Sequence, residues 1–515
     1  MSFNPSRTSS LVSTHQGGPG FAADPKTQLL LLVAGSLFDG DLFYESDQGR
    51  ADRLTFLAKR VTQEDPAFVA LLAAYARQVL GLRSGPAALL AHLFWWGPTA
   101  LAEEVAPKVW LRGDEHLETL AYTRLQGWKI RKSLKVAVAQ RLNRMSPYAL
   151  VKYRREGHSF SQRDALILCH PKPLNWAHAM VYEWLIRGKR ALPEAQALVQ
   201  RLLEERPYWE RVLSQRGSHP ETWRQVLPYL KGLSLLRNLG NLHRHGLLQS
   251  PEVLEHILTH LGCKEEVKRW QIFPHQWLLA IFRGEEEDWP SPLLAALEEA
   301  LEATLPEVHL EGESLVLVDV SGSMYASLSQ NSQATYALAA SSLGALLYRR
   351  LGGRLVGFDG AVHPVRESRE TPIRTLVQTL LDSGGGGTYL GGALQEVLPG
   401  FSGPRVVIFT DEQVADDAMS PLFRWLRQAN HHRAYVINVA GYAPLAFPQE
   451  GLARLAGFSE RLLELLPVME TGDARTWMEQ RLAGLRTTAS VAGEKEDERG
   501  ESHGGEKTFD EIFGA

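Results

Sequence analysis

The sequence has few cysteines and no long apolar run. Its 515 residues include only two cysteines, Cys169 and Cys263, which stand far apart without CxxC spacing. This predicts neither a disulfide framework nor a thiolate zinc site. The longest nearly apolar stretch, Leu29 to Phe38, falls well short of the ~20 residues needed to cross a bilayer, and the N-terminus lacks a basic-then-apolar signal pattern. We therefore expect a cytoplasmic protein with no membrane partner.

A strong net charge is also absent, but the value of −4 conceals an uneven distribution. Residues 1–305 carry a net charge of +5, and the remainder carries −9. Residues 121–172 contain 12 Lys and Arg but only two acids, Glu156 and Asp164. Such a segment favours a polyanionic partner, because each neutralised phosphate releases condensed counterions. A solvated helix surface is the alternative that charge alone leaves open.

The first half of the chain has the pattern of an all-α domain. From about residue 25 to 300, apolar residues recur at helical spacing, and Gly and Pro separate the segments. Helices without strands must bury their apolar faces against neighbours in the sequence, which favours stacked helix pairs of the HEAT type. The sequence shows no clean repeat period, so it does not by itself establish a regular repeat family.

The pattern changes after the acidic run at 285–288. Short runs rich in Val and Leu then alternate with helical stretches, which predicts an α/β domain with a largely parallel sheet. The expected strands are 315–320, 354–358, 406–410 and 435–439, and the expected helices are 334–350, 373–381 and 419–429. The chain ends in a segment rich in Glu, Gly and Lys, which we expect to be disordered.

Oxygen-bearing side chains follow three of the expected strands or turns. Asp319, Ser321 and Ser323 come directly after the strand at 315–320, and Gly322 permits a tight turn between the serines. Thr388 follows a glycine run, and Asp411 ends another strand. Five oxygen ligands of low total charge suit Mg²⁺, so we expect a divalent-metal site at this sheet edge. The alternative is that Asp319 only caps a turn and no ion binds.

This set of residues resembles the metal-ion-dependent adhesion site of von Willebrand factor A domains, in which DxSxS is followed by a Thr and an Asp. All five positions match, and the resemblance covers roughly residues 312–480. It implies that the serines and the threonine bind the metal directly while the aspartates act through water. It also implies that a partner's carboxylate fills the sixth position, so that the site serves binding rather than catalysis.

Several motifs of the first half resemble the TROVE module. They are Gln16-Gly17-Gly18, Gly35-Ser36, Phe43-Tyr44, Lys152 to Gly157, His170-Pro171-Lys172-Pro173, Leu235 to Gly240 and Ile272 to His275. A TROVE module followed by an A domain is the arrangement of Ro proteins. The resemblance implies a ring of HEAT-like helical repeats whose ends the A domain joins. We expect an N-terminal extension at 1–14, the TROVE domain at 15–305, the A domain at 306–485 and a tail at 486–515.

The same resemblance implies an RNA-binding surface. Single-stranded 3′ ends of misfolded noncoding RNAs would enter the ring, and Y RNA would bind the basic outer surface. The residues carried over are Lys152, Arg155 with Arg154 as the alternative, His170, Lys172, Arg237 and Asn238. For His170 the alternative is a helix cap, and for Arg237 and Asn238 it is core packing among the neighbouring leucines. We expect five tryptophans to pack in the helix core rather than to stack on bases: Trp95, Trp96, Trp110, Trp128 and Trp184.

These patterns predict a non-catalytic ribonucleoprotein component that acts in noncoding RNA quality control or decay. No constellation supplies a nucleophile and a base, and neither a P-loop nor a GxSxG elbow is present. The resemblance also implies an exoribonuclease tethered through Y RNA as a further partner, although the sequence does not decide whether one is recruited. Two alternatives stay open: a scaffold that binds an acidic protein through the Mg²⁺ site, and a metal-dependent nuclease.

Overall fold

A computed structural model describes residues 11–35, 44–329, 332–448 and 452–471. The expected tail at 486–515 and most of the N-terminal extension lie outside these residues. The chain forms two compact units, and the first comprises Met1–Leu57, Phe273–Phe282 and Leu301–Trp477. The second holds most of the helices between them, and the helices Asp47–Glu64 and Pro274–Glu286 are divided between the two units. Across the described ranges, no helix has both the length and the apolar character needed to span a membrane.

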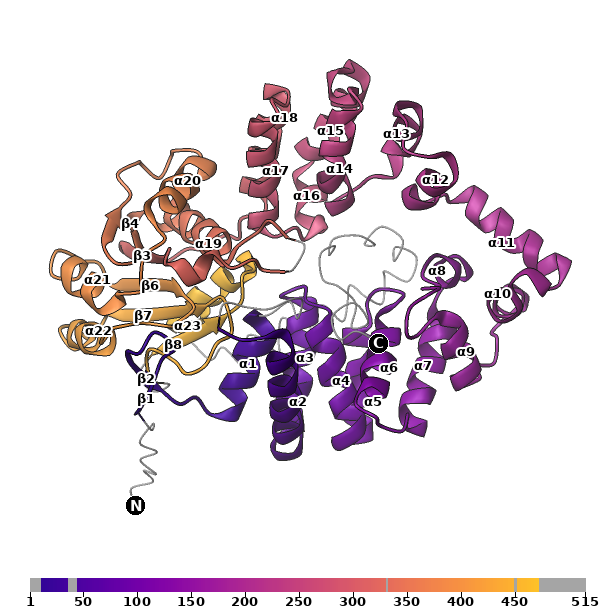
Figure 1. The fold of residues 1–515 in the computed structure, drawn as a ribbon, viewed down its shortest axis with the longest axis horizontal. Helices are drawn as coiled ribbons and strands as arrows, with labels where there is room; N and C mark the ends of the chain where they lie inside the picture. The colour runs from indigo at the N-terminus through magenta and orange to yellow at the C-terminus, as the bar shows by residue number, and fades with distance from the viewer. Residues whose placement is uncertain (1–10, 36–43, 330–331, 449–451, 472–515) are drawn as a thin grey trace. The chain divides into compact units, whose positions relative to one another are not determined.

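The first unit is built on a six-stranded sheet with the order β5-β4-β3-β6-β7-β8 (Figure 1). All neighbouring strands are parallel except β5, which is antiparallel to β4. The four expected strands are confirmed, whereas the two edge strands were not anticipated, because their short, partly exposed sequences carry no apolar run. The strands are β3 (Ser314–Asp319), β4 (Gly353–Phe358), β5 (Val362–Pro364), β6 (Arg405–Thr410), β7 (Arg433–Asn438) and β8 (Ala453–Ala456).

Helices cover both faces of this sheet. Leu315, Leu317 and Ile408 face one side, where they form a core with residues of α21 (Leu390–Val397) and α22 (Met419–Leu426). The alternate residues face α19 and α20 (Figure 1). There α19 approaches so closely that a Cβ at Gly344 would lie 2.4 Å from Val318 Cγ2. Burial on both faces explains why the strands are continuous apolar runs. The bounds of these two helices are Tyr336–Leu351 for α19 and Ile373–Ser383 for α20.

The N-terminal segment belongs to the unit that contains the sheet. Strands β1 (Leu11–Ser13) and β2 (Pro19–Phe21) form a hairpin, and Phe21 bridges to Leu445. Helix α1 (Pro25–Gly35) packs against β8. Glycine at residues 35 and 441 permits this approach, since a Cβ at Gly35 would lie 2.7 Å from the Gly441 nitrogen. The compact units thus differ from the expected division, in which the helical domain begins at residue 15.

The second unit is entirely helical among its described residues. Each helix packs mainly on helices close in sequence: α3 contacts α4 and α5, α4 contacts α6, and α10 contacts α11. This agrees with the stacked helices expected from the pattern. The helices from α2 onward are Asp47–Glu64, Pro66–Gln78, Ser84–Trp96, Thr99–Val109, Glu115–Leu125, Lys132–Arg144, Pro147–Lys152, Gln162–Cys169, Trp176–Arg187, Pro193–Glu205, Trp209–Arg216, Pro220–Val226, Leu233–Arg244, Pro251–Gly262, Lys264–Trp270, Pro274–Glu286 and Ser291–Ala303 (α18).

Local sequence signals determine where several of these helices begin. Asp65 and Ser146 each accept a hydrogen bond from the backbone N–H three residues later, and a proline follows each of them. Ser161 and Asp164 form a reciprocal capping box at the start of α9. These side chains satisfy N–H groups that have no partner inside the helix. Lys152 ends α8, and the rest of the Lys152 to Gly157 motif lies in the loop that the capping box of α9 terminates.

Candidate functional site

The carboxyl edge of the sheet gathers the five expected metal-binding residues. β3 ends at Asp319 and the neighbouring β6 ends just before Asp411, so the two carboxylates meet at one edge. Ser321 and Ser323 lie in the turn after β3. The Gly322 N–H donates to the Gly386 carbonyl at 2.8 Å, which holds the loop carrying Thr388 against that turn. All five residues are buried: Asp319, Ser321, Ser323, Thr388 and Asp411.

Hydrogen bonds join most of these oxygen atoms directly. The Ser323 hydroxyl donates to Asp411 Oδ2 at 2.9 Å, and the hydroxyls of Ser321 and Ser323 lie 3.4 Å apart. Asp319 accepts from the Ser321 N–H at 3.0 Å and from the Thr410 hydroxyl at 2.7 Å. These bonds link Asp319, Ser321, Ser323 and Asp411, whereas none of them involves the Thr388 hydroxyl.

The two carboxylates are held in an unfavourable environment for charge. Burial raises the pKa of Asp319 to about 6. Burial, together with the neighbouring charge of Asp319, raises the pKa of Asp411 to about 8. No basic side chain is among the principal causes of either shift. A cation between the two groups would stabilise their ionised forms.

The donor set fits a hard divalent cation. Thr388 Oγ1 is buried and has no hydrogen-bond partner among the residues that the structure describes, as expected for an oxygen that completes a ligand shell. Two carboxylates and three hydroxyls match the oxygen chemistry that Mg²⁺ prefers. Within the described ranges no group of three or more His, Cys, Asp or Glu could hold a metal, so a cation site depends on the hydroxyls.

The basic segment at 121–172 presents most of its charge to solvent. Seven of its 12 basic residues are exposed: Arg124, Lys129, Arg131, Lys132, Arg144, Arg163 and Lys172. Of these, Lys129, Lys132, Arg144 and Lys172 form no ion pair with any described residue. Basic groups that are neither buried nor neutralised are free to bind phosphate.

The two candidate arginines of the Lys-Tyr-Arg motif have different environments. The side chain of Arg154 is 38% exposed and its guanidinium lies 5.8 Å from the ring centre of Trp184. The side chain of Arg155 is only 7% exposed, and its Nη1 lies 3.9 Å from Glu118 Oε1. Arg154 Nε also lies 3.5 Å from Glu156 Oε2, but this pair is at the surface, where the Glu156 side chain is 70% exposed. Arg154 is therefore the better placed of the two to contact a ligand, because Arg155 is buried beside Glu118.

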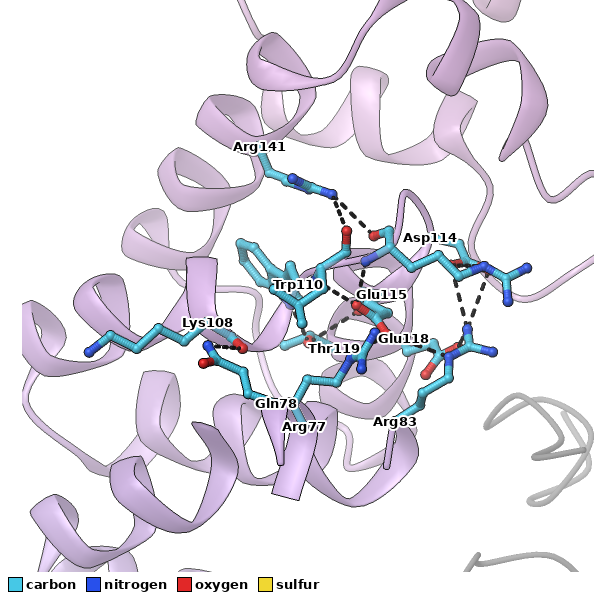
Figure 2. A network of polar contacts seen from close by, with 12 residues as sticks. Arg77, Gln78, Arg83, Lys108, Trp110, Asp114, Glu115, Glu118, Thr119 and Arg141 are labelled. Carbon is cyan, nitrogen blue, oxygen red and sulfur yellow. Dashed lines mark hydrogen bonds and ion pairs between the residues drawn. The ribbon is translucent and has the colours of Figure 1, made fainter. Parts of the chain in front are cut away.

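Arg155 joins a buried group of charges, which we call the Arg83 cluster: Arg77, Arg83, Asp114, Glu115 and Glu118 (Figure 2). Arg83 reaches Glu118 at 2.9 Å and Asp114 at 3.4 Å, and Arg77 reaches Glu115 at 2.7 Å. Glu115 also accepts two backbone N–H bonds from the loop after α5. The cluster thus fastens α3, the start of α4 and α6 to the loop between α5 and α6.

Burial and neighbouring charge act differently on the acids of this cluster. Burial alone would raise the pKa of Asp114, but the guanidiniums of Arg112, Arg83 and Arg155 hold it well below its usual range. Burial raises the pKa of Glu118, and Arg83 only partly offsets this effect. The arginines are therefore needed to keep these carboxylates ionised in the interior.

An exposed stretch follows α9. His170 ends that helix in a left-handed conformation, with φ of 48°, and its backbone N–H donates to Leu166. Its side chain is exposed, as is that of Lys172. Leu174 is 66% exposed and Trp176 is 58% exposed. The sequence pattern did not indicate that Trp176 is a surface residue, because Trp176 is the first residue of an amphipathic helix and has the residue type of a buried position.

The remaining RNA candidates lie on α14. Arg237 is exposed, whereas Asn238 is buried and its amide donates to the Ser234 carbonyl at 2.8 Å. The side-chain oxygen of Asn238, Oδ1, accepts a hydrogen bond from Asn241 Nδ2 at 2.7 Å. For Asn238 the structure agrees with the core-packing alternative, because the side chain is used within the helix.

The tryptophans expected in the helix core divide into two groups. Trp110 is 2% exposed and donates to Thr119. The others are half-buried, with Trp95 stacked on Trp128 at 5.6 Å and Arg131 placed 4.5 Å from the Trp95 ring centre. These partly exposed rings pack on the unit and still offer an edge or face to solvent. Trp96 and Trp184 belong to the same half-buried group.

Comparisons with known proteins agree with this architecture. Residues 196–291 match the model of the TROVE domain. The crystal structure of the Deinococcus radiodurans RO (RSR) protein superposes with a TM-score of 0.64 at 20% identity, over 87% of this chain and 98% of that one. The matched TROVE residues do not include the Lys152 to Pro173 segment, whose role stays a prediction. The chain thus contains a TROVE match and has the fold of a Ro protein, as its sequence motifs indicate.

Proposed function

We propose that this chain is an RNA-binding ribonucleoprotein component that acts without catalysis of its own. It would bind Y RNA and the single-stranded 3′ ends of misfolded noncoding RNAs, in the quality control or decay of these RNAs. The ring of helical repeats that the resemblance implies also stays a prediction. The observation that carries the proposal is the set of exposed basic side chains on α7 and around α9 that pair with no acidic group among the described residues: Lys132, Arg144 and Lys172.

The chemistry of this surface suits a ribonucleotide ligand. Exposed cations bind the phosphate backbone, and adjacent aromatic rings stack on unpaired bases with little sequence preference. Lys172 and Trp176 supply both elements within one exposed stretch. Arg154 beside Trp184 supplies a second such pair. We therefore propose that Arg154, rather than Arg155, makes the arginine contact with RNA that the Lys-Tyr-Arg motif implies.

RNA binding is tested by gel shift with a structured RNA that bears a single-stranded 3′ tail. We expect binding to weaken steeply with salt, and the triple variant Lys152→Ala/Arg154→Ala/Lys172→Ala to bind more than about tenfold more weakly at low salt. The slope of log K against log[salt] should fall by about one for each phosphate contact removed. Arg155→Ala should instead act mainly on stability, because its side chain is buried beside Glu118.

A matched control removes the same charge from the other unit. Arg350, Arg424 and Arg427 are exposed residues of the A-domain unit, and their triple replacement by alanine should leave RNA affinity within about twofold. A wild-type protein that binds no RNA at any salt concentration would favour the scaffold alternative. RNA cleavage that needs Mg²⁺ and disappears in Asp319→Ala would favour the nuclease alternative and contradict the proposal.

We also propose that the five buried oxygen donors hold a divalent metal, with Mg²⁺ as the best fit. Support comes from the buried, mutually repelling carboxylates and from the Thr388 hydroxyl, which has no hydrogen-bond partner in the part of the chain that the structure describes. The metal would neutralise Asp319 and Asp411 and draw the loops of Ser321, Ser323 and Thr388 together. An acidic protein bound to this metal is the second candidate function.

Metal binding predicts a Mg²⁺-dependent rise in melting temperature. A site saturated at 100 times its Kd stabilises the folded state by about 2.7 kcal/mol. Asp319→Asn should abolish both the shift and the heat of binding in a calorimetric titration. Asp382→Asn is the matched control, because Asp382 is exposed and bonds Gln378 on α20. If titration of wild type with Mg²⁺ releases the same heat as titration with buffer, the proposed Mg²⁺ site is contradicted.

A further inference from the structure

The N-terminal segment lies along the loop that carries Asp411. The Thr14 hydroxyl donates to the Val414 carbonyl, and the Gly18 N–H donates to the same atom at 3.1 Å. The backbone N–H of His15 donates to Gln413 Oε1 at 3.0 Å. A Cβ at Gly18 would lie 2.4 Å from the Val414 oxygen, so only glycine permits this approach. Residues 14–18 are therefore seated beside the metal-binding loop.

Tyr44 extends this contact to the donor set itself. Its phenol is hydrogen-bonded to Ser323, and Gln16 Nε2 donates to the same phenol oxygen. The carboxylates of Asp411 and Asp319 are close enough to interact electrostatically with it. Tyr44 thus adds a sixth oxygen to the group formed by the five expected residues.

Packing on both sides holds Tyr44 in this position. Its ring stacks on His15 with 5.0 Å between ring centres and meets Tyr442 edge-on at 5.3 Å. Immediately after it, Glu45 pairs with Arg53 at 2.6 Å, and Arg53 donates to the Gly441 carbonyl at 3.1 Å. The residue that follows Tyr44 is therefore linked through Arg53 to the loop after β7.

We propose that Tyr44 is the internal ligand partner of the A-domain metal site, where its phenol occupies the position that an external carboxylate would take. The inference rests on the proposed metal site. Its consequence is that Mg²⁺ fastens residues 14–18 and Tyr44 to the A domain instead of recruiting an acidic protein. The N-terminal segment of the chain is then part of the metal centre.

The first test is a calorimetric Mg²⁺ titration of wild type and Tyr44→Phe. The phenylalanine ring keeps the packing on His15 and Tyr442 but lacks the oxygen. We expect Mg²⁺ affinity to fall at least about tenfold, because removal of an outer-shell partner alone costs that much and the phenol is proposed to lie at the metal itself. Tyr348→Phe is the matched control, because the Tyr348 hydroxyl donates to the Glu367 carbonyl at 3.0 Å and touches none of the donors. Its titration should match wild type.

The second test measures access of a carboxylate to the bound metal. Acetate added to the Mg²⁺-loaded protein should not change the melting temperature of wild type but should raise that of Tyr44→Ala, which opens the position. Acetate binding to wild type, or equal Mg²⁺ affinity of wild type and Tyr44→Phe, would overturn the role of Tyr44 while leaving the metal site in place. Absence of Mg²⁺ binding to wild type would instead overturn the metal site itself.

Discussion

Replacing Arg83 with methionine is expected to lower the free energy of unfolding of the helical unit by about 3–5 kcal/mol. The Arg83 side chain is 6% exposed and lies within 3.5 Å of three carboxylates, those of Asp114, Glu115 and Glu118. Methionine fills a similar volume but leaves these acids without their shared counter-charge. The free energy of unfolding falls because buried charges stay desolvated after they lose their partner. This effect is several times larger than the loss of a surface ion pair.

Urea unfolding followed by circular dichroism measures this effect. Arg60→Met is the matched control, because Arg60 pairs with Glu64 at 3.0 Å on the surface, where both side chains are about half exposed. It should change the free energy of unfolding by less than about 0.5 kcal/mol. If both variants unfold at the same urea concentration as wild type, the Arg83 cluster does not stabilise the junction of α3, α4 and α6.

The second large effect is a loss of stability in acid, caused by histidines buried in the helical unit. Burial lowers the pKa of His92 to about 3, and burial together with the charge of Arg141 lowers that of His116 to about 3. In the unfolded chain both groups take up a proton near pH 6.5. The unfolded state therefore binds more protons between pH 6.5 and 3, and each histidine lowers stability by about 1.4 kcal/mol per pH unit as the pH falls through this window.

Comparison of variants isolates this contribution from other titrating groups. The raised pKa of Glu118 acts in the opposite direction, because it favours proton uptake by the folded state. The variant His92→Gln can retain a hydrogen bond to Tyr122 but has no ionisable ring. Its stability should therefore depend on pH less steeply than wild type by about 1.4 kcal/mol per unit between pH 6 and 4. The exposed His219→Gln serves as control and should keep the wild-type slope. A wild-type slope in His92→Gln would contradict the prediction.

Much of the A domain was predictable because its signals are local. The strands at β3 and β6 are buried on both faces, so each is an uninterrupted apolar run that stands out in the sequence. Parallel neighbours end at one sheet edge, so the types of residue that follow the strands are enough to indicate a metal site there. The short edge strands β5 and β8 had no such signal, since their residues are partly exposed.

The assignment of individual RNA candidates depended on burial, which the motifs do not encode. Arg154 and Arg155 are adjacent in the sequence, yet one is exposed beside Trp184 and the other faces Glu118. On α14, Arg237 is exposed, whereas the adjacent Asn238 is buried. Rotation by one residue along a helix or turn moves a side chain from solvent to the interior, and neighbouring helices decide which face is covered.

The sequence by itself determined the order of the two halves, the helical and α/β classes, the basic segment and the five residues that we propose as metal ligands. Each of these follows from periodicity, charge or spacing within a few tens of residues. Only the tertiary structure decided that Tyr44 meets Ser323, that His15 meets Gln413, and that Arg83 balances three acids. Contacts between residues up to several hundred positions apart depend on how whole elements pack, and no local pattern records that packing.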